Sequence, residues 1–257
     1  MHSFLVDGKT QDIVLRFFIN DISFRLCVFQ KSIGLRTGIG IAIMDFDYWH
    51  SHWVKNEIRF HQGTPNQSLV ACFKRLNLDP SARVFVPLCG KTRDIAWILD
   101  KGCSVVAVEY ERIAIDQLFD ELAVKPVVTD VGAFKHYSAE GLDVYCGDFF
   151  DLTSELLGSI DATYDRAAIV ALPLEARSRY ATHLKRLTKC APQLVQTAAV
   201  YPANPQKPPF EVSLTELRSH YGNDYGLTCV DQRETPVLKE GYVDYRIYCW
   251  LLVPKAR

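Results

Sequence analysis

The segment from Arg83 to Glu111, RVFVPLCGKTRDIAWILDKGCSVVAVEYE, constrains the fold more than any other part of the chain. It contains a short β-branched run, a turn with a single glycine, a helical stretch and a second β-branched run that ends in acids. Two buried strands joined by a helix form a parallel βαβ unit, which occurs in sheets that helices cover. The segment therefore predicts an α/β protein.

The chain after Met44 continues this alternation of helical and strand patterns. An aromatic-rich helix is expected at 46–60, and a second one follows, for which Asn66 is a suitable N-cap. Further strands are expected at 83–87, 104–110, 142–148, 162–169, 192–200, 228–233 and 242–253, and further helices at 93–99, 111–122, 152–157, 174–187 and 213–222. The last two strands suggest an antiparallel pair at one edge of a mostly parallel sheet, and residues 123–141 read as a polar insert.

The chain of 257 residues, 48% of them hydrophobic, is long enough for one α/β domain with a full core. We expect that domain at 44–257, with 1–43 as an N-terminal extension that matches no targeting class, since Asp7, Asp12 and Asp21 interrupt its apolar residues. Met44 is the only methionine after Met1. Translation starting at Met44 is one hypothesis for this arrangement.

Charge and cysteine usage limit the classes of partner. Lys and Arg total 29 against 30 acids, so the chain has no excess positive charge for a nucleic-acid backbone. No apolar run reaches the ~18 residues that a membrane helix needs. The eight cysteines never form C-x-x-C and mostly lie in apolar runs. This favours buried, reduced thiols over a zinc site or a disulfide framework, and with them a cytoplasmic location. We expect a monomer.

The loop after the first strand suggests the type of ligand. A dinucleotide loop uses three glycines so that the backbone can approach a diphosphate. Here only Gly90 is present, and Leu88 and Cys89 fill the loop with side chains. Glu109 ends the next strand near the ~20-residue offset at which an acid binds ribose hydroxyls. This pattern favours S-adenosyl-L-methionine over a nicotinamide dinucleotide, the alternative being a simple turn glycine with a solvated acid.

Two later strand ends carry further candidates. Asp148 could accept a hydrogen bond from an adenine amino group while Phe149 packs on the base; alternatively, Asp148 caps a helix and Phe149 is a core aromatic. Asp165 and Arg166 follow the fourth strand, where Arg166 could hold an anionic substrate or form only a surface salt bridge. No cysteine or carboxylate at suitable spacing completes a metal site with His50, His52 and His61, so these are expected to be surface or capping residues. His61 is also a candidate for removing a proton.

The motifs WHSHWVKNEIRFHQG (49–63), VFVPLCGK (84–91), VVAVE (105–109), YCGDFFDL (145–152), YDRAAIVAL (164–172) and PPF (208–210) occur in this order. Together they resemble the thiopurine S-methyltransferase family in its bacterial form. W-x(10)-F-H-Q followed by P-L-C-G-K is a specific pair, and the resemblance runs from Met44 nearly to the C-terminus. Residues 1–43 have no counterpart in it.

The resemblance implies a Rossmann-like methyltransferase fold with seven strands, the last two an antiparallel hairpin, and helices on both faces. It also implies methyl transfer from S-adenosyl-L-methionine to a small aromatic or heterocyclic thiol. The cofactor-binding residues carried over are Trp49, Phe60, Leu88, Gly90, Glu109, Asp148, Phe149 and Arg166, with Arg166 also the catalytic candidate.

The sequence leaves alternative interpretations of the N-terminal aromatics, of the 202–210 loop and of the methyl acceptor. The N-terminal aromatics could be core residues, but with the motifs in view Trp49 and Phe60 are expected to form a lid, whereas Trp53 could simply pack. The loop 202–210 could be an acceptor-pocket wall or a rigid connector. Alternative functions are methylation of selenium or tellurium species or of halide, and cofactor binding without catalysis.

Overall fold

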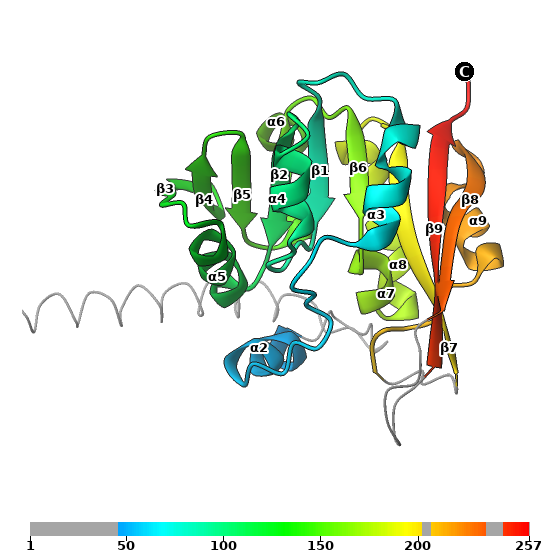
Figure 1. Cartoon of the computed structure of the whole chain (residues 1–257), viewed down its shortest axis with the longest axis horizontal. Helices are drawn as coiled ribbons and strands as arrows, with labels where there is room; N and C mark the ends of the chain where they lie inside the picture. The colour runs from blue at the N-terminus through cyan, green and yellow to red at the C-terminus, as the bar shows by residue number, and fades with distance from the viewer. Residues whose placement is uncertain (1–45, 202–206, 235–243, 257) are drawn as a thin grey trace, which may run out of the picture. The chain divides into compact units, whose positions relative to one another are not determined.

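The computed structural model of the chain describes residues 46–201, 207–234 and 244–256. The expectations for 1–43, and for the first half of the 202–210 loop, lie outside these residues. Within the described ranges, the core is one mixed sheet with helices on both faces (Figure 1).

The sheet has nine strands in the order β3-β4-β5-β2-β1-β6-β7-β9-β8. Their bounds are β1 Arg83–Pro87, β2 Ser104–Glu109, β3 Val127–Val131, β4 Phe134–Ala139, β5 Leu142–Cys146, β6 Ala162–Asp165, β7 Gln193–Tyr201, β8 Tyr225–Glu234 and β9 Asp244–Pro254. The strands β5, β2, β1, β6 and β7 are parallel. At one edge, β9 pairs antiparallel with both β7 and β8, as the alternation near the C-terminus predicted.

The strand order reverses beside β1. From β1 the chain proceeds to β2 and β5 on one side, whereas β6 and β7 lie on the other. In open α/β sheets, ligands bind outside the carboxyl ends of the strands at such a point. The loops after β1, β2, β5 and β6 are therefore where the site is expected.

Helices cover the two faces as two groups, because successive residues of each buried strand point to opposite sides. The helices are α3 Gln67–Cys72, α4 Asp94–Leu99, α5 Arg112–Leu122, α6 Ser154–Leu157, α7 Ala168–Ala171, α8 Leu174–Leu187 and α9 Leu214–Tyr221. One hydrophobic cluster joins Val84 and Val86 to α3, α4 and α5. The other joins Phe85 to α6, α7, α8 and α9.

The polar insert is the main addition to the predicted sheet. All seven expected strands are present, and 127–139 adds the antiparallel pair β3 and β4 beyond β5. The side chains of β3 are almost all exposed, so no buried alternation marks this strand in the sequence. Phe134 and Tyr137 are the buried residues of β4, and they anchor the hairpin to the core.

The N-terminal helix is shorter than predicted. Helix α2 spans Phe46–Val54 rather than 46–60, because the chain leaves the helix at Asn56, whose φ is 55°. The predicted cap at Asn66 is confirmed, since its side chain accepts the N–H groups of Ser68 and Leu69 at 2.9 and 3.2 Å.

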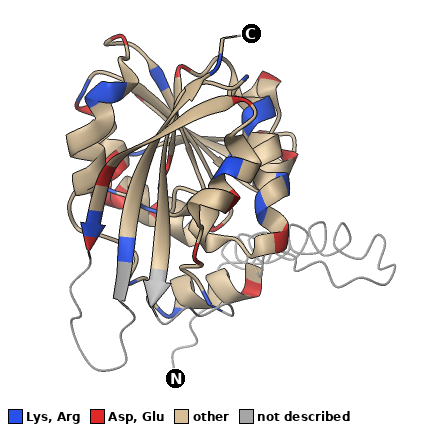
Figure 2. Ribbon diagram, turned by 90° about the vertical axis from the view of Figure 1, so that its right-hand side faces the viewer, with Lys and Arg blue, Asp and Glu red and all other residues tan. Residues whose placement is uncertain are grey.

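Charged residues of both signs are interspersed over the helices and strand ends (Figure 2). This distribution agrees with the formal net charge of −1. Among the described residues, no helix combines the length and apolar composition needed to cross a membrane.

Candidate functional site

The loop after β1 has an uncommon backbone. Leu88 and Gly90 both have positive φ, at 46° and 54°. For a branched residue such as Leu88 this conformation is strained, and strain of this kind concentrates at functional sites. A Cβ on Gly90 would lie 3.3 Å from Cζ2 of Trp53, so a side chain there would crowd the indole ring. Burial raises the pKa of the neighbouring Cys89 thiol, which makes it an unreactive core residue.

Glu109 joins the first two loops at the end of β2. Its Oε2 accepts the Gly90 N–H at 2.7 Å and its Oε1 accepts the Glu111 N–H at 2.8 Å. Burial raises the pKa of Glu109, and these backbone N–H groups oppose that rise. A carboxylate has about four acceptor sites. The backbone N–H groups of Gly90, Glu111 and Tyr110 use three of them, so the group can still accept a hydroxyl.

Helix α2 lies against the loop after β2. Phe46 stacks on Tyr110 with ring centroids 3.9 Å apart, and His50 Nδ1 lies 3.0 Å from Oε1 of Glu111. Together with the close approach of Trp53 to Gly90, these contacts place α2 against the loops after β1 and β2, which the Glu109 carboxylate connects. Trp53, which the sequence left as a packing residue, is 4% exposed.

The aromatic residues after α2 meet the fourth strand end. Phe60 lies edge-on to Trp49 and to Trp53, with ring centroids 5.6 and 5.7 Å apart. Its carbonyl accepts a hydrogen bond from Arg166 Nη2 at 3.1 Å. The structure thus brings Trp49, Phe60 and Arg166 together, although 106 positions separate the last two in the chain.

The turn after β6 is held from within the core. Asp165 is fully buried and accepts the Tyr180 O–H at 2.8 Å and the Ile169 N–H at 3.3 Å. Ala167 adopts a φ of 65°, again in the left-handed region. These contacts determine the backbone position of Arg166 between them.

Asp165 should make the stability of the fold depend on pH. Burial raises its pKa to about 6, although the Tyr180 hydroxyl and two backbone N–H groups oppose the rise. A carboxyl with a raised pKa in the folded state stabilises the fold fully below its unfolded pKa and less as pH rises through the folded value.

The expected loss between pH 4 and pH 6.5 is roughly 2 to 3 kcal/mol of unfolding free energy. Asp165→Asn has no titrating group but keeps an acceptor for Ile169 N–H, so it is the reference. Urea unfolding across this range should show the wild-type stability falling relative to Asp165→Asn. A difference in unfolding free energy between the two proteins that stays constant with pH would contradict the raised pKa of Asp165.

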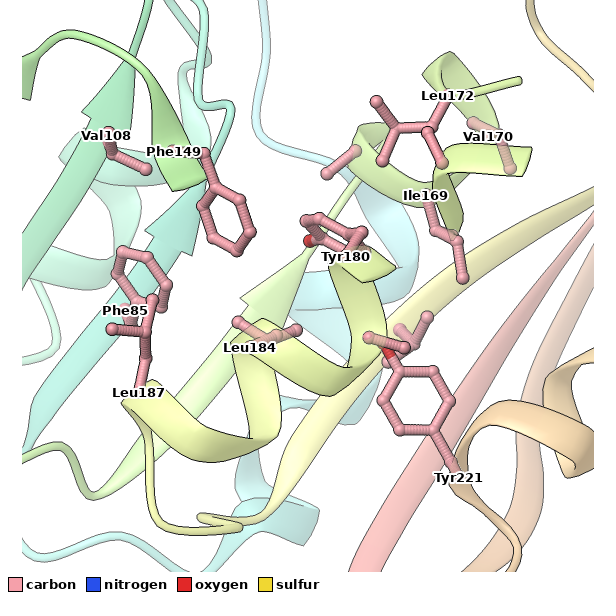
Figure 3. Close-up of a cluster of buried hydrophobic side chains, with 14 of the residues drawn as sticks. Phe85, Val108, Phe149, Ile169, Val170, Leu172, Tyr180, Leu184, Leu187 and Tyr221 are labelled. Carbon is pink, nitrogen blue, oxygen red and sulfur yellow. The ribbon is translucent and has the colours of Figure 1, made fainter. Parts of the chain in front are cut away.

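Phe149, just after the end of β5, does not lie as expected for a side chain that packs on an adenine base. Its ring is 1% exposed and packs in the core beside Tyr180 (Figure 3), with ring centroids 4.9 Å apart. The His183 ring lies 5.0 Å from it. Asp148 caps the short 3-10 helix η2, Phe149–Asp151, by accepting the Phe150 N–H at 2.8 Å. The alternative of a cap followed by a core aromatic describes these two side chains.

A cluster that the sequence did not indicate lies beside the glycine loop. Glu121, at the end of α5, is 3.0 Å from Lys91 Nζ, 3.1 Å from Arg93 Nε and 3.6 Å from His61 Nε2. Its members come from three separate segments, so no local spacing could have predicted it. The only sequence signal was the His61 imidazole itself.

Two surface hollows lie beside α5 and α8, and Gly90, Glu109 and Arg166 line neither of them. One of about 570 Å³ is between α5 and the β3–β4 hairpin, and one of about 600 Å³ is between Phe150 and α8. Among the described residues, no group of three or more His, Cys, Asp and Glu side chains is placed to hold a metal ion.

Solved structures define the class of this fold. A SAM-dependent methyltransferase from Anabaena variabilis ATCC 29413 superposes with a TM-score of 0.54 over 81% of this chain and 94% of its own, at 11% identity. Magnesium protoporphyrin IX methyltransferase from Synechocystis PCC 6803, solved with bound SAH, gives a TM-score of 0.54 over 80% and 96%, at 15% identity. The chain thus has the Rossmann-like fold of the SAM-dependent methyltransferases.

Sequence relatives narrow the class to a family. The family model described as thiopurine S-methyltransferase matches residues 44–243. The thiopurine S-methyltransferase of Xanthobacter autotrophicus is 47% identical over 210 residues, covering 81% of this chain and 99% of the relative. That of Teredinibacter turnerae is 42% identical over 190 residues, covering 74% and 88%. This chain belongs to the thiopurine S-methyltransferase family.

Proposed function

We propose that this chain transfers a methyl group from S-adenosyl-L-methionine to the sulfur of aromatic or heterocyclic thiols. The observation that carries the proposal is the convergence of Gly90, Glu109, the Trp49–Phe60 pair and Arg166 at neighbouring strand ends. These residues come from the segments that resemble the family, and the family model spans them all.

The residues around Glu109 fit the cofactor. Its carboxylate keeps acceptor capacity for a ribose hydroxyl, and the loop of Leu88 and Gly90 presents backbone beside it. Trp49 and Phe60 offer aromatic surface that covers the site from the N-terminal side. For the adenine end we assign Asp148 and the main chain of Phe149, since the Phe149 ring is packed in the core.

S-adenosyl-L-methionine supplies an electrophilic methyl group on a positively charged sulfur. The chain must align the acceptor, exclude water and stabilise the acceptor as a thiolate. Alignment alone can supply ~7 to 11 kcal/mol of barrier lowering. Arg166 remains protonated and uses one of its five N–H donors on Phe60, so other donors remain for an anionic sulfur.

The direct test is calorimetry with S-adenosylhomocysteine, followed by turnover of thiophenol and of a mercaptopurine. We expect binding and methylation of both acceptors. Binding without turnover of any thiol would favour a non-catalytic cofactor-binding protein. Turnover of selenium or tellurium species or of halide, in preference to thiols, would favour the other acceptor classes.

Replacing Arg166 by glutamine should lower kcat/KM for thiols about 100-fold, the size typical of losing one donor to a developing anion. Affinity for S-adenosylhomocysteine should change by less than about tenfold, because most of the loss concerns the acceptor. Arg112→Gln is the control, since the Arg112 side chain is 62% exposed and its Nε pairs with Asp116 one helical turn away on α5. Equal losses in affinity and turnover would assign Arg166 to cofactor binding instead.

We further propose that the enzyme acts as a cytoplasmic monomer on small molecules and does not bind nucleic acid. The near-zero net charge and five buried free cysteines among the described residues support this placement. Sedimentation analysis at micromolar concentration would test the oligomeric state.

A further inference from the structure

His61 lies where the segment after helix α2 meets the reacting end of the site. It directly follows Phe60, whose carbonyl binds Arg166. Its backbone N–H donates to the Ile58 carbonyl at 2.8 Å, which closes a tight turn. Its side chain is 16% exposed, so the imidazole is largely enclosed but not sealed from a ligand.

The groups that face His61 come from three other segments. They are Glu121 on α5, Lys91 and Arg93 in the loop after β1, and Arg166 after β6. Burial is the main cause that lowers the pKa of His61, and the three cations lower it further while Glu121 opposes them. The imidazole is therefore neutral at pH 7 and able to accept a proton.

Glu121 faces the Nε2 edge of the imidazole. Its Oε1 lies 3.6 Å from His61 Nε2, and the Lys91 and Arg93 side chains hold the same carboxylate at 3.0 and 3.1 Å. A carboxylate on that side favours the tautomer with its proton on Nε2, which leaves the lone pair on Nδ1. Once Nδ1 is protonated, Glu121 compensates the new charge.

We infer that His61 is the general base for acceptors that reach the site as neutral thiols, with Glu121 as its positioning residue. In this step the S–H bond of the acceptor breaks and its proton goes to Nδ1 of His61. The thiolate forms an S–CH3 bond as the methyl–sulfonium bond of S-adenosyl-L-methionine breaks. The products are a methyl thioether, S-adenosylhomocysteine and an imidazolium, which releases its proton to solvent. This inference rests on the proposed thiol methylation.

The experiment compares His61→Gln with wild type on thiols graded by acidity, from a nitro-substituted thiophenol to a benzyl-type thiol. General base catalysis contributes roughly 100-fold or more. We expect kcat/KM at pH 7 to fall about 100-fold for the least acidic thiol and less than about threefold for the most acidic one, which is already ionised. Calorimetry with S-adenosylhomocysteine should give an unchanged Kd.

Two further variants exclude a structural explanation. His136→Gln is the matched control, because His136 also faces an acid, Asp143 at 2.8 Å, but lies on β4 away from the site. This variant should leave kcat/KM unchanged for both the least acidic and the most acidic thiol. Glu121→Gln should shift the acidic limb of the kcat/KM profile to lower pH, because Glu121 raises the pKa of His61.

The outcomes separate the two proposals. Equal loss on all thiols, or no loss on any, would overturn the role of His61 while leaving thiol methylation intact. An acidic limb that does not move in Glu121→Gln would overturn the positioning role. Failure of wild type to methylate any thiol would overturn the proposed function, and the base with it.

Discussion

Replacement of Glu109 by alanine is expected to weaken S-adenosylhomocysteine binding by roughly 1 to 3 kcal/mol, because it removes charge-assisted hydrogen bonds to the ribose. The same carboxylate accepts the Gly90 and Glu111 N–H groups, so its loss also loosens the loops that line the site. Since Glu109 is 9% exposed, solvent provides little compensation for the lost acceptors.

Titration calorimetry measures this effect, and Glu109→Gln supplies the matched variant. Glutamine keeps the volume and one acceptor oxygen but removes the charge, so we expect an intermediate affinity. Thermal unfolding of both variants should show cooperative transitions, which separates a local loss from a failure to fold. An affinity equal to that of wild type in Glu109→Ala would remove Glu109 from the site.

The largest expected effect on stability is at Arg177. This residue is 3% exposed and donates to the Leu172 carbonyl, the Glu211 carbonyl and the Glu216 carboxylate at 2.8 to 2.9 Å. Its guanidinium thereby joins α8 to the segment that precedes α9. Arg177→Met should lower the unfolding free energy by about 3 to 5 kcal/mol, because it leaves two carbonyls without this donor and removes the cation from the Glu216 carboxylate, which keeps the His220 contact at 3.3 Å.

Urea unfolding measures this loss, with Arg112→Met as the matched control. Arg112 forms an exposed i,i+4 pair with Asp116, so its replacement should cost less than about 1 kcal/mol. The double variant Arg177→Met/Glu216→Met should be more stable than the sum of the two single losses predicts, because neither charge is left unpaired. Additive losses, or a cost below about 1 kcal/mol for Arg177→Met, would show that the pair contributes little.

Residues near Arg177 also bear on the acceptor side. The Phe210 N–H donates to the Val170 carbonyl at 2.7 Å, and its ring lies 5.7 Å from the Arg177 guanidinium. The end of the 202–210 loop is thus attached to α7, the helix that follows Arg166. This attachment favours the pocket-wall interpretation of the loop, although its first half lies outside the described residues.

Local patterns were sufficient for the elements whose stability depends on burial periodicity. The buried β-branched runs of β1 and β2, the amphipathic α8 and the Asn66 cap could all be predicted, because each is specified by neighbours in the chain. The β3–β4 hairpin was missed, since an edge strand with exposed side chains carries no such period. Helix α2 was extended too far because its aromatics continue past Asn56, where the backbone turns.

The sequence by itself determined the α/β class, the glycine loop, the acid at its expected offset and the order of the family motifs. Only the tertiary structure decided which side chains meet. It placed Phe149 in the core, bound Arg166 to the carbonyl of Phe60 and grouped His61, Lys91 and Arg93 around Glu121. The physical reason is that these contacts join segments far apart in the chain, whose distances depend on packing across the sheet and not on spacing along it.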